Sequence, residues 1–292
     1  MLRDLRSLKP TLTQASAALS RTVTVVDEQG QPRELAIPAE RALTVYLDQH
    51  EVVTLMTLGA QPEWLVLGYL LNQRLITRVE EVASVQVDWS MGAGETGEPG
   101  VAAVRTHAGL VASERLQAPR VHTSGCGQGS LFADVLDNVL SQPLPPAQLQ
   151  RETLFGLETM RLQPTQYRRT GSVHGCALFQ GDQLLCLVED VGRHNALDAI
   201  AGWMALQGET GQDKVFYTTG RLTSEMIIKA AQMGVPIVVS RSGITQMGHA
   251  VAERLNLCAI GRATGKHFYA YTALSRLVLQ PDLAGPRLRA PA

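Results

Sequence analysis

Strand-like and helix-like segments alternate along the second half of the chain, and this alternation restricts the fold more than any other feature of the sequence. The apolar pattern predicts strands over 172–179, 183–190, 214–219, 236–240, 257–261 and 267–272, and helices over 195–207, 224–233 and 248–256. Strands joined by helices of about ten residues form a largely parallel sheet with helices on both faces. The second half is therefore expected to be an α/β domain of this kind.

The first half predicts a smaller α+β unit. We expect a β-hairpin over 22–26 and 33–38, a β pair over 43–47 and 52–56, an apolar helix that begins near Pro62, and strands over 82–89 and 101–106. A further helix is expected over 147–161. The chain is divided into a flexible arm (1–21), a small α+β domain (22–115), an α/β domain (116–280) and a tail (281–292).

Charge and cysteine content exclude several classes of function. The 292 residues are 45% hydrophobic and 18% charged, and the formal net charge is −1, so a large nucleic-acid-binding surface is not expected. No apolar run approaches the roughly 20 residues of a membrane span, and the N-terminus lacks the apolar core of a signal peptide. The four cysteines form no close pair, which argues against a disulfide framework or a zinc site. We expect a reduced, cytoplasmic protein that binds no metal, nucleic acid or membrane.

One cysteine, Cys126, stands in a glycine-rich loop. The stretch 123–132 reads TSGCGQGSLF, with glycine at 125, 127 and 129. Glycines allow backbone conformations that bring a thiol close to a ligand. The alternative is that Cys126 behaves as a small buried hydrophobe, as free cysteines commonly do. The glycines favour a reactive thiol, so Cys126 is the candidate catalytic residue.

Polar clusters follow several of the predicted strands, where ligands bind in such sheets. The segment 189–195, EDVGRHN, is the densest. It can be a capped turn with Asp190 or Asn195 as the N-cap, an anion pocket, or an acid/base apparatus. Capping alone does not require both Arg193 and His194, which favours a functional role.

Three further strand ends carry hydroxyl groups or cations. The segment 218–225, TTGRLTSE, can hold a phosphate or can be an ordinary capping box. The segments 240–245 (SRSGIT) and 261–267 (GRATGKH) repeat the pattern. A series of such loops favours one anionic ligand over unrelated caps. The predicted ligand-binding residues are Arg193, His194, Thr219, Gly220, Arg221, Ser240, Arg241, Ser242, Arg262, Thr264, Gly265, Lys266, His267 and Phe268.

The same segments resemble a known family, the formate dehydrogenase accessory sulfurtransferases (FdhD). The likeness covers about residues 22–272 and is carried by TGSVHGCALF (170–179), EDVGRHNALD (189–198), TTGRLTSEMIIKAAQMGVPIVVSRS (218–242) and the closing YT (271–272). The resemblance implies a cytidine-deaminase-like three-layer α/β/α domain and a cytoplasmic homodimer. It also implies that the chain takes sulfur from a cysteine desulfurase and holds it as a cysteine persulfide. That sulfur passes to the molybdenum cofactor in its bis-molybdopterin guanine dinucleotide form, before insertion into formate dehydrogenase.

The cysteine loop departs from the family pattern. The family loop usually reads SxCGxCG, whereas this chain has Gly129 at the position of the second cysteine. The family also tends to have Phe and Arg where this chain has Arg262 and Thr264. Two hypotheses follow. The chain is a sulfur carrier that acts through Cys126 alone, or it is a non-catalytic binding module for the molybdenum cofactor that has lost sulfur transfer. An unrelated nucleotide hydrolase is disfavoured, because no metal-ligand set or water-activating motif is present.

Overall fold

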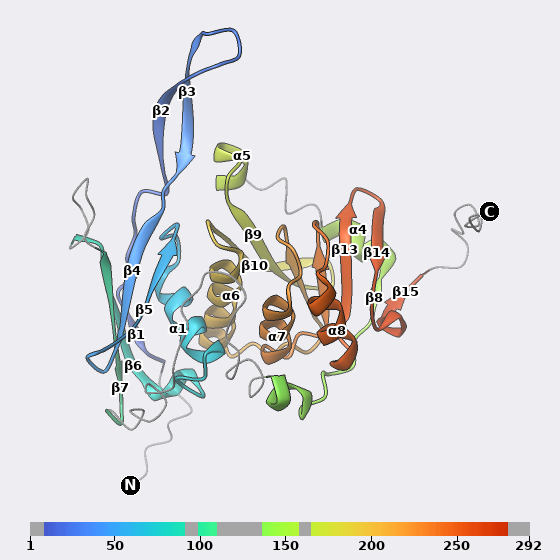
Figure 1. Cartoon of the computed structure of the whole chain (residues 1–292). Coiled ribbons are helices and arrows are strands. Elements are labelled where there is room, and N and C mark those ends of the chain that lie inside the picture. The colour runs from blue at the N-terminus through green and yellow to red at the C-terminus, as the bar shows by residue number, and fades with distance from the viewer. Residues whose placement is uncertain (1–8, 91–98, 110–135, 158–164, 280–292) are drawn as a thin grey trace.

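Two β-sheets with helices packed between and around them make up the computed structural model of the chain, which describes residues 9–90, 99–109, 136–157 and 165–279 (Figure 1). The larger sheet has the order β10-β9-β11-β12-β13-β14. Its strands are β9 (His174–Gln180), β10 (Gln183–Asp190), β11 (Lys214–Thr218), β12 (Ile237–Ser240), β13 (Cys258–Thr264) and β14 (His267–Ala270).

The expectation of a largely parallel sheet is wrong. Strands β11, β12 and β13 are parallel, but β9 is antiparallel to both β10 and β11, and β14 is antiparallel to β13. Short turns cause this difference, because a tight turn can join only antiparallel neighbours, whereas a helical crossover joins parallel strands. Gly181 and Gly265, both at positive φ, lie in the two turns (58° and 59°).

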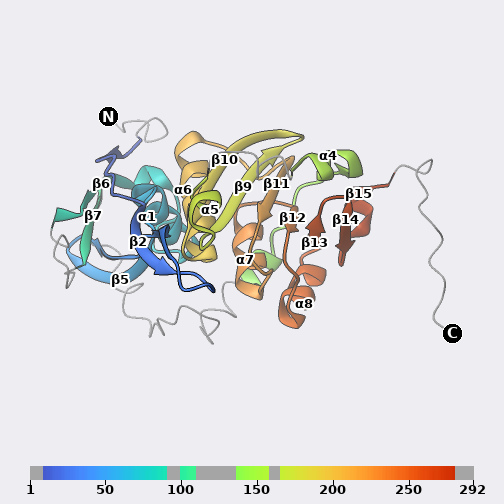
Figure 2. The same cartoon turned by 90° about the horizontal axis from the view of Figure 1, so that it is seen from above.

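Three helices cover one face of this sheet: α6 (Arg193–Gln207), α7 (Ser224–Gln232) and α8 (Gln246–Arg254). The other face is covered by α4 (Arg151–Gly156) and by the short parallel pair β8 (Leu149–Gln150) and β15 (Leu277–Val278). Figure 2 shows α7 and α8 on one side of the sheet and α4 on the other. The three-layer α/β architecture expected for this half is therefore present.

The helix expected over 147–161 is shorter in the structure. Residues 149–150 form β8, which pairs with β15, so the helix begins only at Arg151. Residues 158–164 lie outside the described residues. Leu149, Leu154 and Leu157 have helix-like spacing and face the same core, but Leu149 reaches it from strand β8.

The smaller sheet has the order β1-β6-β7-β4-β5. It contains β1 (Thr11–Leu12), β4 (Arg41–Leu47), β5 (His50–Thr57), β6 (Val82–Asp88) and β7 (Gly100–Thr106), and helix α1 (Pro62–Asn72) packs against it. The expected hairpin is confirmed as β2 (Ser20–Val26) and β3 (Pro32–Pro38), and it projects at the end of the molecule where α5 (Gln166–Thr170) lies (Figure 1). Short 3-10 turns occupy Val79–Glu81 and Leu274–Arg276.

Part of the expected N-terminal arm is fixed to this sheet. Strand β1 pairs in parallel with β6, and the Thr13 hydroxyl donates to the Val85 carbonyl oxygen at 3.1 Å. The expected boundary near residue 115 lies outside the described residues, so the division into domains stays a prediction. No helix among the described residues has both the length and the apolar character needed to cross a membrane.

Helices α1 and α6 join the two sheets through an unusually close contact. A Cβ atom on Gly68 would lie 1.7 Å from the Asp198 carbonyl oxygen, and one on Gly202 would lie 2.0 Å from the Trp64 carbonyl oxygen. The helices can therefore meet only because both positions lack a side chain. Asn72 adds a buried hydrogen bond across the interface to the Asp198 carboxylate at 2.7 Å.

Substituting Gly202 with Ala tests this contact. The added methyl group would overlap the backbone of α1, so we expect the free energy of unfolding to fall by about 2 kcal/mol or more. Chemical denaturation of the full chain measures the change. Gly156→Ala is the matched control, since nothing lies within 4 Å of a Cβ at that helical position. Equal stabilities for the two variants would show that α1 and α6 do not pack this closely.

Candidate functional site

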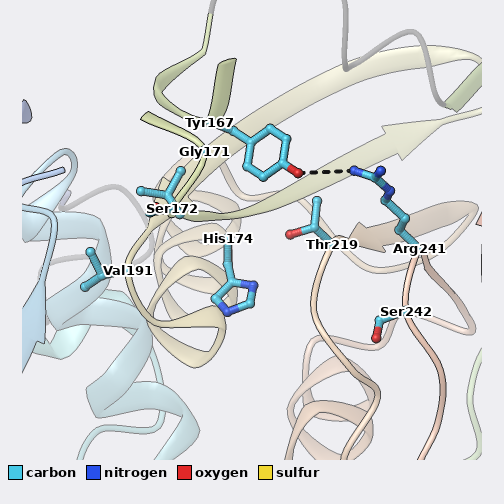
Figure 3. A pocket seen from close by; sticks show the side chains of 9 residues that line it. Tyr167, Gly171, Ser172, His174, Val191, Thr219, Arg241 and Ser242 are labelled. Carbon is cyan, nitrogen blue, oxygen red and sulfur yellow. Dashed lines mark hydrogen bonds between the residues drawn. The ribbon is translucent and has the colours of Figure 1, made fainter. Parts of the chain in front are cut away.

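A cavity of about 540 Å³ opens at the sheet edge where β10, β11 and β12 end. Figure 3 shows side chains from four segments around it. The cavity combines hydroxyl groups, an imidazole and a guanidinium. Its lining residues are Tyr167, Gly171, Ser172, Val173, His174, Val191, Thr219, Arg241 and Ser242.

Three of the predicted binding residues, Thr219, Arg241 and Ser242, line this cavity. The other lining residues were missed, and the direction of β9 explains most of the omission. Because β9 is antiparallel to β11, its first residue, His174, lies at the edge where β11 ends. The expectation of a largely parallel sheet directed attention to strand ends alone. The stretch TGSVH (170–174), which leads into β9, is the sequence feature that could have identified these residues.

Hydrogen bonds between the backbone and the Thr219 and Ser240 side chains hold the cavity walls together. The Thr219 hydroxyl accepts from the Gly175 amide at 3.0 Å, and the Thr219 amide donates to the Gly175 carbonyl oxygen at 2.9 Å. Ser240 is fully buried, and its hydroxyl donates to the Gly220 carbonyl oxygen at 2.6 Å while accepting from the Ser242 amide at 2.9 Å. The structure thus assigns the Ser240 side chain to bracing the two loops, away from the cavity surface.

Positive charge surrounds His174. Burial lowers the pKa of His174, the nearby Arg193 lowers it further, and Arg221 acts in the same direction, while Asp190 opposes them. Arg193 lies against Gly220, where a Cβ atom would meet the Arg193 Cδ at 2.8 Å. Glycine at 220 is therefore required for this arrangement. A neutral imidazole has one donor and one acceptor nitrogen, so His174 can donate one hydrogen bond to an anionic ligand that these cations attract.

His194 points away from the cavity. Its Nε2 lies 3.3 Å from a carboxylate oxygen of Glu225 on α7. Glu225 also pairs with Lys229, whose ammonium lies 2.8 Å from the Asp198 carboxylate. Burial, reinforced by Lys229 and Arg193, lowers the pKa of His194 to about 4, although Glu225 opposes the shift. His194 belongs to a buried ionic cluster between α6 and α7.

The remaining residues of the 189–195 segment take structural roles. The N-cap of α6 is Gly192, which corrects the expectation of Asp190 or Asn195 at that position. Asp190 supports the turn by accepting from the Gly192 amide and the Asn195 side-chain amide, both at 2.9 Å. In the 218–225 segment Thr223 is the N-cap of α7, and its hydroxyl accepts from the Met226 amide. Thr219 lines the cavity, and phosphate binding by this segment stays a prediction.

The predicted segment 262–268 lies on the β13–β14 hairpin, outside the cavity lining. Arg262 adopts a positive φ of 51° at a bulge, and its amide donates to the Ser242 carbonyl oxygen at 2.7 Å. Phe268 packs toward α4, with its ring centroid 6.1 Å from that of Phe155, which indicates a packing role. Of the predicted residues on this hairpin, Arg262, Thr264, Lys266 and His267 have exposed side chains.

Cys126, the candidate catalytic residue, lies outside the described residues. The other three cysteines, Cys176, Cys186 and Cys258, are buried. Burial raises the pKa to about 12 for Cys176 and for Cys186, and to about 11 for Cys258. Since the thiolate is the reactive form, these three thiols are inert near neutral pH.

The titration of His194 gives a test of the buried ionic cluster. The folded chain keeps this imidazole neutral down to about pH 4, whereas the unfolded chain protonates it below its ordinary value of 6.5. Through this group, the free energy of unfolding therefore falls as the pH is lowered from 6.5 towards 4. Denaturation should show that the stability of the wild type, relative to His194→Asn, decreases over this range. A relative stability that increases on acidification would contradict the assignment.

The chain is similar to known proteins of one family. The model of the FdhD/NarQ family matches residues 38–278. The sulfur carrier protein FdhD of Bacillus subtilis (strain 168) is 32% identical over 258 residues, which cover 86% of this chain and 94% of the relative. The sulfur carrier protein FdhD of Halalkalibacterium halodurans is 29% identical over 271 residues, covering 91% of this chain and 97% of the relative.

A solved structure supports the same assignment at the level of the fold. It is described as a formate dehydrogenase accessory protein from Desulfotalea psychrophila, and it aligns with a TM-score of 0.67 at 24% identity. The alignment covers 89% of this chain and 98% of the other. With the family match extending over both sheets, the chain belongs to the FdhD/NarQ family.

Proposed function

We propose that this chain is a sulfurtransferase that accepts sulfur from a cysteine desulfurase as a persulfide on Cys126. It then transfers the sulfur to the molybdenum cofactor, in its bis-molybdopterin guanine dinucleotide form, before the cofactor enters formate dehydrogenase. Relatives named sulfur carrier protein FdhD support the carrier role. With these partners, the sulfur transfer is expected to take place in the cytoplasm. The likeness to the family favours a homodimer.

The observation that carries the ligand half of the proposal is the chemistry of the cavity. Thr219, Ser242, Arg241 and His174 line it. The positive charges of Arg193 and Arg221 lie near enough to lower the pKa of His174. Hydroxyl groups, a neutral imidazole and a fork-shaped guanidinium together suit the phosphates of a nucleotide. The volume also falls within the range of roughly 300–1,000 Å³ typical of small-molecule sites.

The sulfur chemistry requires one thiolate for loading and a two-electron reductant for release, either a second thiol or the acceptor metal. In loading, the Cys126 thiolate attacks the outer sulfur of the desulfurase persulfide, and the desulfurase cysteine leaves as a thiolate. Release as sulfide then forms a disulfide between Cys126 and another thiol, which supplies the two electrons. Gly129 stands where the family has its second cysteine, and the other three thiols are buried. We therefore assign the second thiol to another molecule.

Loading of Cys126 is the direct test of the carrier role. After incubation with a cysteine desulfurase and cysteine, peptide mass spectrometry should show a gain of roughly 32 Da, one sulfur atom, on Cys126. Cys186→Ala is the control, because a buried thiol should not affect loading. Absence of the adduct from Cys126 under conditions that load the desulfurase would contradict sulfur transfer by this chain.

The alternative, a cofactor-binding module without sulfur transfer, is favoured by Gly129 in place of the second cysteine. The two functions separate in cells that depend on this chain for formate dehydrogenase activity. Cys126→Ala should abolish that activity if the chain carries sulfur. Retained activity would support the binding module.

Substitution of Arg241 tests whether the guanine nucleotide binds in this cavity. Removing its guanidinium should weaken the binding of GDP, a probe for the guanine-nucleotide portion of the cofactor. A charge-assisted hydrogen bond contributes about 1.5–3 kcal/mol, so we expect a loss of roughly 10- to 100-fold in affinity for Arg241→Ala by titration calorimetry. Arg254→Ala, at the exposed end of α8, should bind GDP like the wild type. Equal affinities for both variants would place the nucleotide elsewhere.

A further inference from the structure

A single aromatic ring, that of Tyr167, forms one wall of the cavity, and no sequence motif pointed to it. Figure 3 shows the ring beside the cavity, with its hydroxyl directed at the Arg241 guanidinium across the opening. The Arg241 Nη1 donates to the Tyr167 hydroxyl at 3.4 Å. The residue is 37% exposed. The ring therefore presents free aromatic surface next to a cation.

The short helix α5 is fixed in a way that holds this ring in place. Five residues are too few for a stable isolated helix, so its position depends on outside contacts. The Glu189 carboxylate accepts from the Gln166 amide at 2.6 Å and from the Tyr167 amide at 3.0 Å. Thr165 caps the helix, and Gly171, at a φ of 71°, ends it. The tyrosine is thus anchored through its own amide to the end of β10.

The arrangement of ring and cation fits one class of ligand. Aromatic side chains stack on nucleobases, and guanidinium groups bind phosphates. Tyr167 supplies the first group and Arg241 the second, and the hydroxyls of Ser172, Thr219 and Ser242 line the space beside them. A ligand that carries both a flat heterocycle and a phosphate can use all of these groups, whereas inorganic phosphate or pyrophosphate cannot use the ring.

We propose that Tyr167 is the stacking platform for the heteroaromatic ring of the ligand, with the Tyr167–Arg241 contact setting the separation between the ring site and the phosphate site. This inference rests on the proposed function, since it assumes that a guanine nucleotide enters the cavity. It adds a specificity-determining residue, because the platform separates nucleotides from phosphates that lack a base. The hydrogen bond from Arg241 holds the ring beside the phosphate site.

The test compares GDP with inorganic pyrophosphate on the full chain by titration calorimetry. Stacking contributes about 1–3 kcal/mol per base, so Tyr167→Leu should weaken GDP binding by roughly 5- to 150-fold and leave pyrophosphate binding within about twofold. Tyr167→Phe keeps the ring and should retain most of the GDP affinity. Tyr269→Leu, which removes a tyrosine that is 61% exposed on β14 outside the cavity, should bind both ligands like the wild type.

Each other outcome has a distinct meaning. If the wild type binds GDP and Tyr167→Leu binds it equally well, the stacking role is wrong while the proposed function stands. If Tyr167→Leu loses GDP and pyrophosphate to the same extent, the tyrosine only positions Arg241, and the stacking role is again wrong. If the wild type binds pyrophosphate but not GDP, the guanine-nucleotide part of the proposed function fails, and the stacking role fails with it.

Discussion

The buried carboxylate of Asp190 joins the two parts of the molecule at the edge where the cavity opens. It accepts hydrogen bonds from the Thr57 hydroxyl and the Leu58 amide of the smaller part, at 2.5 and 3.0 Å, and from Gly192 and Asn195 at the start of α6. Burial raises the pKa of this carboxyl, whereas these hydrogen bonds lower it and favour the charged form. These four hydrogen bonds fix the end of β10. They therefore also fix the next residue, Val191, which lines the cavity.

The helix layer extends this connection. Helices α1 and α6 meet at Gly68 and Gly202, and the Asp198–Lys229 pair ties α6 to α7. Residues of the family motif EDVGRHNALD therefore act mainly in holding the site together, since Asp190, Asn195 and Asp198 make buried structural contacts. A substitution in this motif is expected to alter the cavity through the fold. Contacts with the ligand are better assigned to Thr219, Arg241 and Ser242.

Periodicity predicted most helices and strands of the second half well, because the apolar spacing of the helices differs from that of the extended segments between them. Periodicity says nothing of strand direction, and the directions of β9 and β14 follow instead from the short connections 181–182 and 265–266, which can join only antiparallel neighbours. The same limit explains why His174 and Tyr167 were missed. His174 begins β9 and Tyr167 precedes it, and in a parallel sheet the start of a strand lies at the edge opposite to the strand ends. Phe268 was predicted to bind the ligand because it follows cations in the sequence, but it is partly buried and packs against the core.

The molecule has a second cavity, of about 830 Å³, lined in part by residues near the opposite end of α6, including Met204 and Ala205. Amide chemical shifts during a GDP titration of the isotope-labelled full chain compare the two sites within one molecule. The account predicts that the largest shifts fall at 172–174, 219–221 and 240–243, around the cavity at the ends of β10, β11 and β12. Shifts concentrated at 72–77, 138–142 and 231–233, around the second cavity, would contradict the central claim that the nucleotide binds where Arg241 lies.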